Sequence, residues 1–304
     1  MSRFRFGWIP DIPDFRDYSE ETTSVREIMA ATGLRPKRTV PRAFRGNRPK
    51  RASDSFPPAV DLRAHCSPVE DQGRLGSCTA NAGAGIIEYY ERRAFGRHLD
   101  ASRLFLYKAA RNLMRLKGDT GAYLRTTIGA MVLFGVPPEE HWPYDDGPDR
   151  FDQEPPAFCY AFAQNYKAVR YYRHDIPGTP AEETLGRVKA HLASGHPSMF
   201  GFTVYSSIES ADARGAIPFP GPKERIEGGH AVAAVGYDDR IEIKNGKKGG
   251  RETTGALLIR NSWGTNWGEG GYGWLPYEYV SRGLAEDFWS VLKKDWVDTG
   301  AFNE

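Results

Sequence analysis

The spacing of apolar residues divides the chain into a helical first part and a β-rich second part. Apolar and small residues recur at helical spacing in four runs, over residues 77–95, 102–116, 126–134 and 180–194. Four shorter runs are rich in β-branched and aromatic residues and lie between glycine-rich turns, over residues 198–205, 230–237, 256–260 and 272–276. Helices first and strands later predict an α+β fold with two lobes.

Residues 1–56 follow a different pattern. Residues 7–14 alternate turn-forming and apolar residues, and Pro10 and Pro13 disfavour a helix there, so an extended conformation is expected. A short helix is expected around residues 20–31, where a glycine soon follows.

A basic, proline-containing stretch over residues 35–51 carries eight basic residues and no acidic ones, which is typical of an exposed linker. We therefore expect residues 1–56 to form an N-terminal segment and residues 57–304 to form the compact domain. Within that domain the change from helices to strands divides a first lobe, about 57–160, from a second, about 161–290.

Composition and charge are those of an ordinary globular protein. Hydrophobic residues make up 40% of the 304 residues and charged residues 26%, and no run approaches the roughly 18 apolar residues of a membrane span. Residues 1–56 hold 12 basic against 7 acidic residues, whereas the remainder holds 29 against 32. A basic arm on a mildly acidic body can dock on that body or on another partner.

The start of the chain shows no conventional secretory signal, because no apolar stretch follows its first basic residues. The expected location is therefore cytoplasmic, or outside the cell by a non-classical route. The chain has three cysteines, which are Cys66, Cys78 and Cys159. This small, odd number argues against a disulfide framework. We expect Cys66 and Cys159 to be structural.

Cys78 stands where a reactive thiol is physically favoured. It begins the predicted helix over residues 77–95, and free amide groups together with the helix dipole at that end stabilise a thiolate. The thiolate is the nucleophilic form. Gln72 lies six residues earlier and can add a side-chain amide to the backbone amide of Cys78, giving two donors for an oxyanion.

Two further motifs supply a histidine and an asparagine. The run Gly-His-Ala-Val-Ala-Ala-Val-Gly-Tyr over residues 229–237 puts His230 at the start of a small-residue strand, where the imidazole is rigidly held. The run Arg-Asn-Ser-Trp-Gly-Thr-Asn-Trp-Gly over residues 260–268 contains Asn261.

Together the three motifs resemble the papain family of cysteine proteases, over about residues 57–290. The resemblance implies that Cys78 is the nucleophile, His230 its base, Asn261 the residue that orients the base, and Gln72 an oxyanion donor. It also implies that Trp263, supported by Trp267, shields the bond between Asn261 and His230 from water. The implied fold has an α-helical left lobe and a β-barrel-like right lobe, with the active-site cleft between them.

The sequence departs from the family pattern in places. Leu75 replaces the first Cys of the Cys-Gly-Ser-Cys-Trp signature and Thr79 replaces its Trp, so the usual disulfide bond near the nucleophile is missing. His230 follows Cys78 by 152 residues, somewhat beyond the usual spacing, and residues 238–254 read as an inserted polar hairpin that accounts for most of the excess between His230 and Asn261.

The substrate-binding residues are also implied by the resemblance. Two glycines suggest a roomy side-chain pocket, which Tyr123, Leu124, Gly201 and Gly228 would border. The full expected set that lines the cleft comprises Gly121, Ala122, Tyr123, Leu124, Gly201, Gly228 and Gly229.

The expected activity is endopeptidase cleavage of protein or peptide substrates through a thioester, starting from a Cys78 thiolate and His230 imidazolium pair, with no cofactor and no metal. His191 and His196 have poor spacing for a metal and are expected at the surface. We expect residues 1–56 to act as an intramolecular inhibitor of the cleft.

Three alternative functions remain open. An acyl transferase could use the same Cys-His framework with an amine in place of water. A non-catalytic interaction protein could keep the same body, although such relatives usually lose one of these residues. A nucleic-acid binder could use residues 35–51, but that stretch lacks interleaved aromatic residues and a recognisable module, so binding of nucleic acid is not expected.

Overall fold

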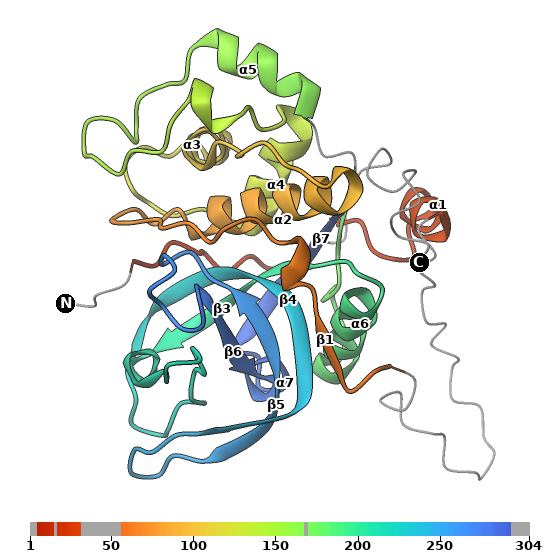
Figure 1. Ribbon diagram of the computed structural model, residues 1–304, viewed down its shortest axis with the longest axis vertical. Coiled ribbons are helices and arrows are strands. Elements are labelled where there is room, and N and C mark those ends of the chain that lie inside the picture. The colour runs from red at the N-terminus through yellow and green to blue at the C-terminus, as the bar shows by residue number, and fades with distance from the viewer. Residues whose placement is uncertain (1–4, 15–16, 32–55, 167–169, 293–304) are drawn as a thin grey trace.

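The computed structural model shows two lobes, one helical and one built on an antiparallel sheet (Figure 1). It describes residues 5–14, 17–31, 56–166 and 170–292. The predicted α+β, two-lobed fold is therefore confirmed. The linker predicted over residues 35–51 lies outside the described residues.

The helical lobe surrounds one buried helix. Its α-helices are α2 (Cys78–Phe95), α3 (Arg103–Met114), α4 (Leu124–Leu133) and α5 (Ala157–Ala163). Helix α2 is buried continuously from Cys78 to Tyr90, because its Ala and Gly residues allow α3, α4 and the sheet to approach closely. The four helices predicted within the compact domain all exist, with ends that differ by at most two residues.

The second lobe is built on one open antiparallel sheet. Its strands are β1 (Ala59–Asp61), β2 (Arg170–Arg173), β3 (Ser198–Tyr205), β4 (Ile226–Lys244), β5 (Glu252–Arg260), β6 (Tyr272–Pro276) and β7 (Ala285–Leu292). The strand order is β2-β7-β3-β4-β5-β6, and β1 pairs with β4. Strands β3 and β6 match their predicted bounds, whereas β4 and β5 are longer because the insertion over residues 238–254 continues their pairing as a hairpin.

Three further α-helices and several short turns complete the described fold. The α-helices are α1 (Thr23–Ala31), α6 (Ala181–Ala193) and α7 (Tyr277–Ser281), and the 3-10 turns are η2 (Arg63–His65), η3 (Glu139–His141), η4 (Gln164–Tyr166) and η5 (Ser206–Ser210). Helix α6 packs on the sheet through the buried side chains of Val188 and Leu192. Among the helices that the structure describes, none has the length and apolar character needed to cross a membrane.

The first described residues run between the two lobes, as the red trace in Figure 1 shows. We call residues 5–14 the strap. The Trp8 amide donates to Gly229 O (3.0 Å) on the sheet side, while Ala122 on the helical side donates to Gly7 O (2.8 Å) and accepts from the Ile9 amide (3.2 Å). The strap is therefore hydrogen-bonded to both lobes and adopts the extended conformation predicted for it.

Residues 17–31 also belong to the compact body. The Arg173 amide in β2 donates to Tyr18 O (2.8 Å), and Val25 and Met29 of α1 are 0% and 1% exposed within the hydrophobic core. The compact domain was expected to begin near Pro57, and the packing of residues 17–31 against it was not predicted.

Candidate active site

Cys78 lies at the first turn of α2 and is held there by a tightly bonded loop. The Gly76 amide donates to Asp119 Oδ1 (2.9 Å), and the Gln72 amide donates to Ser262 O (2.8 Å) in the other lobe. Leu75, which stands where a disulfide-forming cysteine would be, is 3% exposed and packs into the core. Apolar packing thus fixes this loop, and all three cysteines of the chain are free and buried.

His230 and Asn261 meet because β4 and β5 are neighbours in the sheet. Asn261 follows the last residue of β5, and the pairing of Ala233 with Arg260 brings it beside His230. His230 Nε2 lies 2.8 Å from Asn261 Oδ1. The indole of Trp263 stacks on the imidazole, with ring centroids 4.4 Å apart and an interplanar angle of 21°. The ring is therefore held at one nitrogen and covered on one face.

The second ring nitrogen of His230 is available for chemistry. His230 Nδ1 is buried and has no hydrogen-bond partner among the described residues. The thiol of Cys78 lies against the same strand, since Cys78 Sγ accepts from the Ala231 amide (3.4 Å). A buried thiol therefore lies against the residue that follows His230, and one nitrogen of that imidazole is without a hydrogen-bond partner among the described residues.

Burial controls the charge of both groups. Cys78 and His230 are each 0% exposed, and the Phe6 ring of the strap lies 6.1 Å from the His230 ring and from the Trp263 ring, edge to face. Loss of hydration raises the pKa of the Cys78 thiol to about 11 and lowers the pKa of His230 to about 4. Both shifts favour the neutral thiol and the neutral imidazole while the strap covers them.

Gln72 is buried with its amide directed at the strap. Its Oε1 accepts from Ser262 Oγ (2.6 Å), which fixes the orientation of the amide, and its Nε2 donates to Leu75 O (2.7 Å) and, more weakly, to Arg5 O (3.4 Å). A main-chain carbonyl oxygen of the strap thus lies within reach of this donor.

The expected substrate-binding residues line the path of the strap. A Cβ at Gly121, whose φ is 75°, would collide with the backbone of Gly7, and one at Gly201 would collide with the Trp8 indole. Gly228 faces Phe6 and Gly229 faces Trp8 in the same way. Ala122 pairs with the strap, and at the start of α4 Tyr123 is half-buried and Leu124 fully buried.

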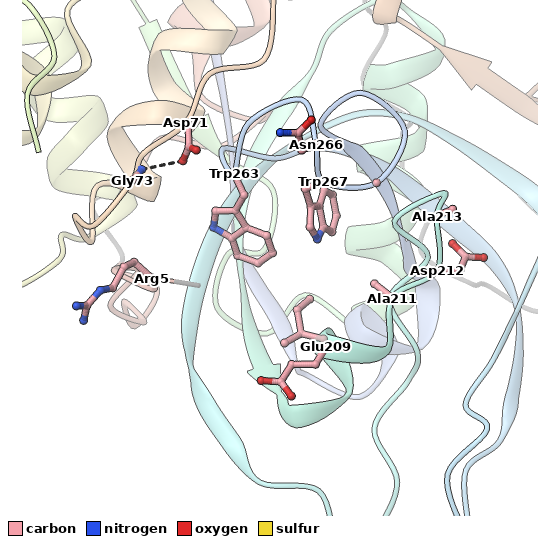
Figure 2. A pocket seen from close by; sticks show the side chains of 12 residues that line it. Arg5, Asp71, Gly73, Glu209, Ala211, Asp212, Ala213, Trp263, Asn266 and Trp267 are labelled. Carbon is pink, nitrogen blue, oxygen red and sulfur yellow. Dashed lines mark hydrogen bonds between the residues drawn. The ribbon is translucent and has the colours of Figure 1, made fainter. Parts of the chain in front are cut away.

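Beyond Trp263 the cleft opens into a cavity of about 790 Å³ (Figure 2). Arg5 of the strap lies at one side and the segment around Glu209 and Asp212 at the other. Trp267 stands edge to face against Trp263, with ring centroids 5.3 Å apart. The cavity therefore lies beside Trp263 of the site and Arg5 of the strap.

Sequence reasoning missed two residues that the structure brings to the cleft. Trp8 is 4% exposed, and its Nε1 donates to Asp287 Oδ2 (3.1 Å) at the inner end of the groove. Asp287 lies in β7, 279 positions later in the chain, so no local spacing signals the pair.

The sequence led us to expect His191 and His196 at the surface. That prediction is wrong, because they are only 2% and 0% exposed. His191 converges with Glu20 and His174: Glu20 Oε1 lies 3.3 Å from His174 Nδ1 and 3.7 Å from His191 Nδ1. In the part of the chain that the structure describes, these three side chains alone have the closeness of metal ligands. Spacing in sequence could not reveal them, because they come from three separate segments.

Comparison with known proteins places this geometry in a family. The family model described as papain family cysteine protease matches residues 56–289. The chain is 34% identical to an uncharacterized peptidase C1-like protein, L477, of Acanthamoeba polyphaga mimivirus, over 94% of this chain and 86% of that protein. It is 30% identical to cathepsin K of Gallus gallus, over 84% of this chain and 70% of that protein.

Two solved structures of cysteine proteases also resemble this chain. Xylellain, a cysteine protease from Xylella fastidiosa, is 35% identical with a TM-score of 0.69, covering 96% of this chain and 98% of that chain. A cysteine protease of Carica candamarcensis shares the fold with a TM-score of 0.56, over 78% of this chain and 99% of that chain. Fold, motif order and family match point the same way, and the chain belongs to the papain family of cysteine proteases, enzymes that hydrolyse peptide bonds.

Proposed function

We propose that Cys78 is the nucleophile of peptide-bond hydrolysis, with His230 as its general base, Asn261 as the residue that orients the imidazole, and Gln72 together with the Cys78 amide as the oxyanion site. The observation that supports these roles is the combination of one bonded and one free imidazole nitrogen: Nε2 is 2.8 Å from Asn261 Oδ1, while Nδ1 has no hydrogen-bond partner among the described residues.

The reaction then follows from these positions. Once the strap leaves, water reaches the pair, the thiol proton moves to His230 Nδ1, and the Cys78 thiolate attacks the substrate carbonyl carbon. The carbonyl oxygen takes the negative charge, which Gln72 Nε2 and the Cys78 amide stabilise. His230 gives its proton to the leaving amine, leaving a thioester. Water attacks the thioester, its proton passes to His230 and on to Cys78, and the carboxylic acid product departs.

The N-terminal segment, residues 1–56, serves as an intramolecular inhibitor of the catalytic domain, residues 57–304, whose two lobes meet at the cleft. The strap occupies the groove with three main-chain hydrogen bonds to Ala122 and Gly229, and it covers Cys78 and His230. These wall residues, with Gly121, Tyr123, Leu124, Gly201 and Gly228, would take the main chain and one side chain of a protein substrate.

The segment is held at three points along its length. Trp8 fills the groove, Arg125 of α4 forms ion pairs with Asp11 (3.0 Å) and Asp17 (2.9 Å), and Glu20 docks on His174. Because residues 17–31 are anchored on the body beyond the cleft, they keep the strap, which precedes them in the chain, close to the groove.

The test compares full-length chains on an unstructured protein substrate. A chain with Phe6→Ala and Trp8→Ala loses both aromatic contacts of the strap, and an Ile12→Ala chain serves as the matched control, since Ile12 is 85% exposed in the same segment. We expect the double variant to cleave substrate much faster than the native and Ile12→Ala chains, and Cys78→Ala to abolish cleavage in every background. Equal rates in the double variant and the control would refute latency. Cleavage that survives Cys78→Ala would refute the assigned nucleophile.

A further inference from the structure

We propose that Asp287 makes the pocket beneath the strap selective for a tryptophan side chain of the substrate, by accepting the indole N–H at the closed end of the pocket. This inference rests on the proposed function of the cleft. Trp8 is then the chain's own occupant of a pocket that substrates use.

The walls of this pocket fit a flat bicyclic ring. The indole of Trp8 lies against Gly201 so closely that a Cβ there would collide with it, and a Cβ at Gly229 would come 2.8 Å from Trp8 Cε3. Trp8 is 4% exposed in this position. Two glycines facing one ring therefore provide a slot that a side chain at either position would close.

The inner end of the slot presents one carboxylate oxygen to the occupant. Asp287 is fully buried, and its two oxygens are used separately: Oδ1 accepts from Trp289 Nε1 (2.6 Å), and Oδ2 accepts from Trp8 Nε1 (3.1 Å). An occupant without an N–H at this point, such as phenylalanine, leaves Oδ2 without its donor. Unpartnered buried polar atoms are costly, so the site discriminates between the two rings.

Asp287 is held in this position under strain. Its φ is 64°, in the left-handed region that non-glycine residues rarely adopt, and its amide donates to Asp175 Oδ2 (2.7 Å). Residues kept in such conformations by their surroundings are concentrated at functional sites. The backbone geometry therefore serves to direct the Asp287 carboxylate into the slot.

The charge around Asp287 argues for a neutral donor over a cation. Arg173, which is fully buried, places its guanidinium 3.2 Å from Asp287 Oδ1 and pairs with Asp175 as well (3.1 Å). Burial also raises the pKa of Asp287, which disfavours its charged form. A lysine or arginine side chain would lose its hydration and meet a cation already in place. An indole supplies an N–H without that charge.

A substrate strand can reach the same slot. The strap bonds through its main chain to Gly229 on one wall and Ala122 on the other, and these groups are available to any extended peptide once the strap departs. A peptide held between the same walls would present a side chain to the slot beneath.

The first test is a double-mutant cycle in the full-length chain, using Trp8→Phe and Asp287→Asn. The readout is the rate at which iodoacetamide alkylates Cys78, which reports how often the strap leaves. We expect Trp8→Phe to speed alkylation by about tenfold when Asp287 is present, and by less than about threefold in the Asp287→Asn background. Equal effects in the two backgrounds would overturn the role of Asp287. A Trp8→Arg chain that protects Cys78 better than the native chain would show a cation pocket instead.

The second test uses substrates and does not alter Asp287. A full-length Trp8→Ala chain, with its slot vacated, is given peptides that differ at one position as Trp, Phe or Arg, and we expect kcat/KM to fall in that order. Adding Gly201→Ala should remove the preference for Trp and leave cleavage of an Ala-containing peptide in place. If no peptide is cleaved although Cys78 is alkylated rapidly in this chain, the proposed function fails, and the alkylation cycle then decides only whether Asp287 holds Trp8. If Arg peptides are cleaved best, the inference alone is overturned.

Discussion

Arg125 provides a sharp test of how the segment is held. Its guanidinium lies 3.0 Å from the Asp11 carboxylate, 2.9 Å from that of Asp17 and 3.9 Å from that of Asp14, and it donates to Ile12 O (3.0 Å). One cation of the body thus gathers three carboxylates of the segment. The substitution Arg125→Met removes the charge and keeps most of the apolar stem.

The size of the effect follows from the burial of this cluster. The Arg125 side chain is 26% exposed and Asp17 only 5%, so water screens the ion pairs only in part. Charge-assisted hydrogen bonds are worth about 1.5–3 kcal/mol each, and removal of the shared cation adds repulsion among the remaining carboxylates. We expect the segment to lose about 3 kcal/mol of docking free energy, which raises the released fraction by roughly a hundredfold.

The assay follows Cys78 alkylation in the intact chain at neutral pH, with Arg240→Met as the matched control. Arg240 is 73% exposed and pairs only with Asp238 among the described residues, so its loss should leave the rate unchanged. Alkylation should be roughly a hundredfold faster in Arg125→Met. If both variants react at the native rate, the carboxylate cluster does not hold the segment and the reasoning from it is wrong.

Three other predictions concern the body of the enzyme. Asn261→Ala removes the partner of His230 Nε2 and should lower kcat by about ten- to a hundredfold with little change in KM, measured on peptide substrate in a chain freed of the strap. Gln72→Ala should lower kcat by about a hundredfold or more in the same assay, and a thermal melt would separate this loss from misfolding. Burial lowers the pKa values of His191, His196 and His230, to about 4 for His191 and His230, so the stability these neutral rings provide is complete above pH 6.5 and is lost as the pH falls towards 4. Urea unfolding between pH 7 and 4.5 should show a decline of up to about 4 kcal/mol per pH unit, and a flat profile would contradict buried neutral histidines.

The sequence predicted the elements whose signal is local. The small-residue run that begins at His230 and the glycine-bounded run over residues 272–276 carry their own periodicity, so both appeared as strands in the expected places. The length of β4 was underestimated because its outer half is polar, and only its pairing with β5 makes it a strand. Leu75 is a similar case in the site. A leucine at this position in the sequence reveals that the disulfide is missing, but the burial of its side chain, which replaces the disulfide, is seen only in the structure.

Features that depend on long-range contacts were out of reach. His191 was expected at the surface because its spacing from His196 does not suit a metal site, but it is buried and lies 3.7 Å from Glu20 of the N-terminal segment. The pairing of Trp8 with Asp287 joins opposite ends of the chain. Both misses have the same cause: the N-terminal segment was expected to block the cleft, but the side chains on which it would pack could not be read from local spacing.

The burial of Val25 and Met29 within the core has a consequence for how such an enzyme is controlled. Because α1 packs in the body, the strap would under the proposed latency behave as a tethered ligand, with an effective concentration at the groove of the order of millimolar. Its return is an intramolecular event that dilution of the protein does not slow. Competing peptides must therefore exceed that local concentration or bind more tightly than the strap, so the enzyme would respond to the abundance of its substrate and return to rest when the substrate is consumed.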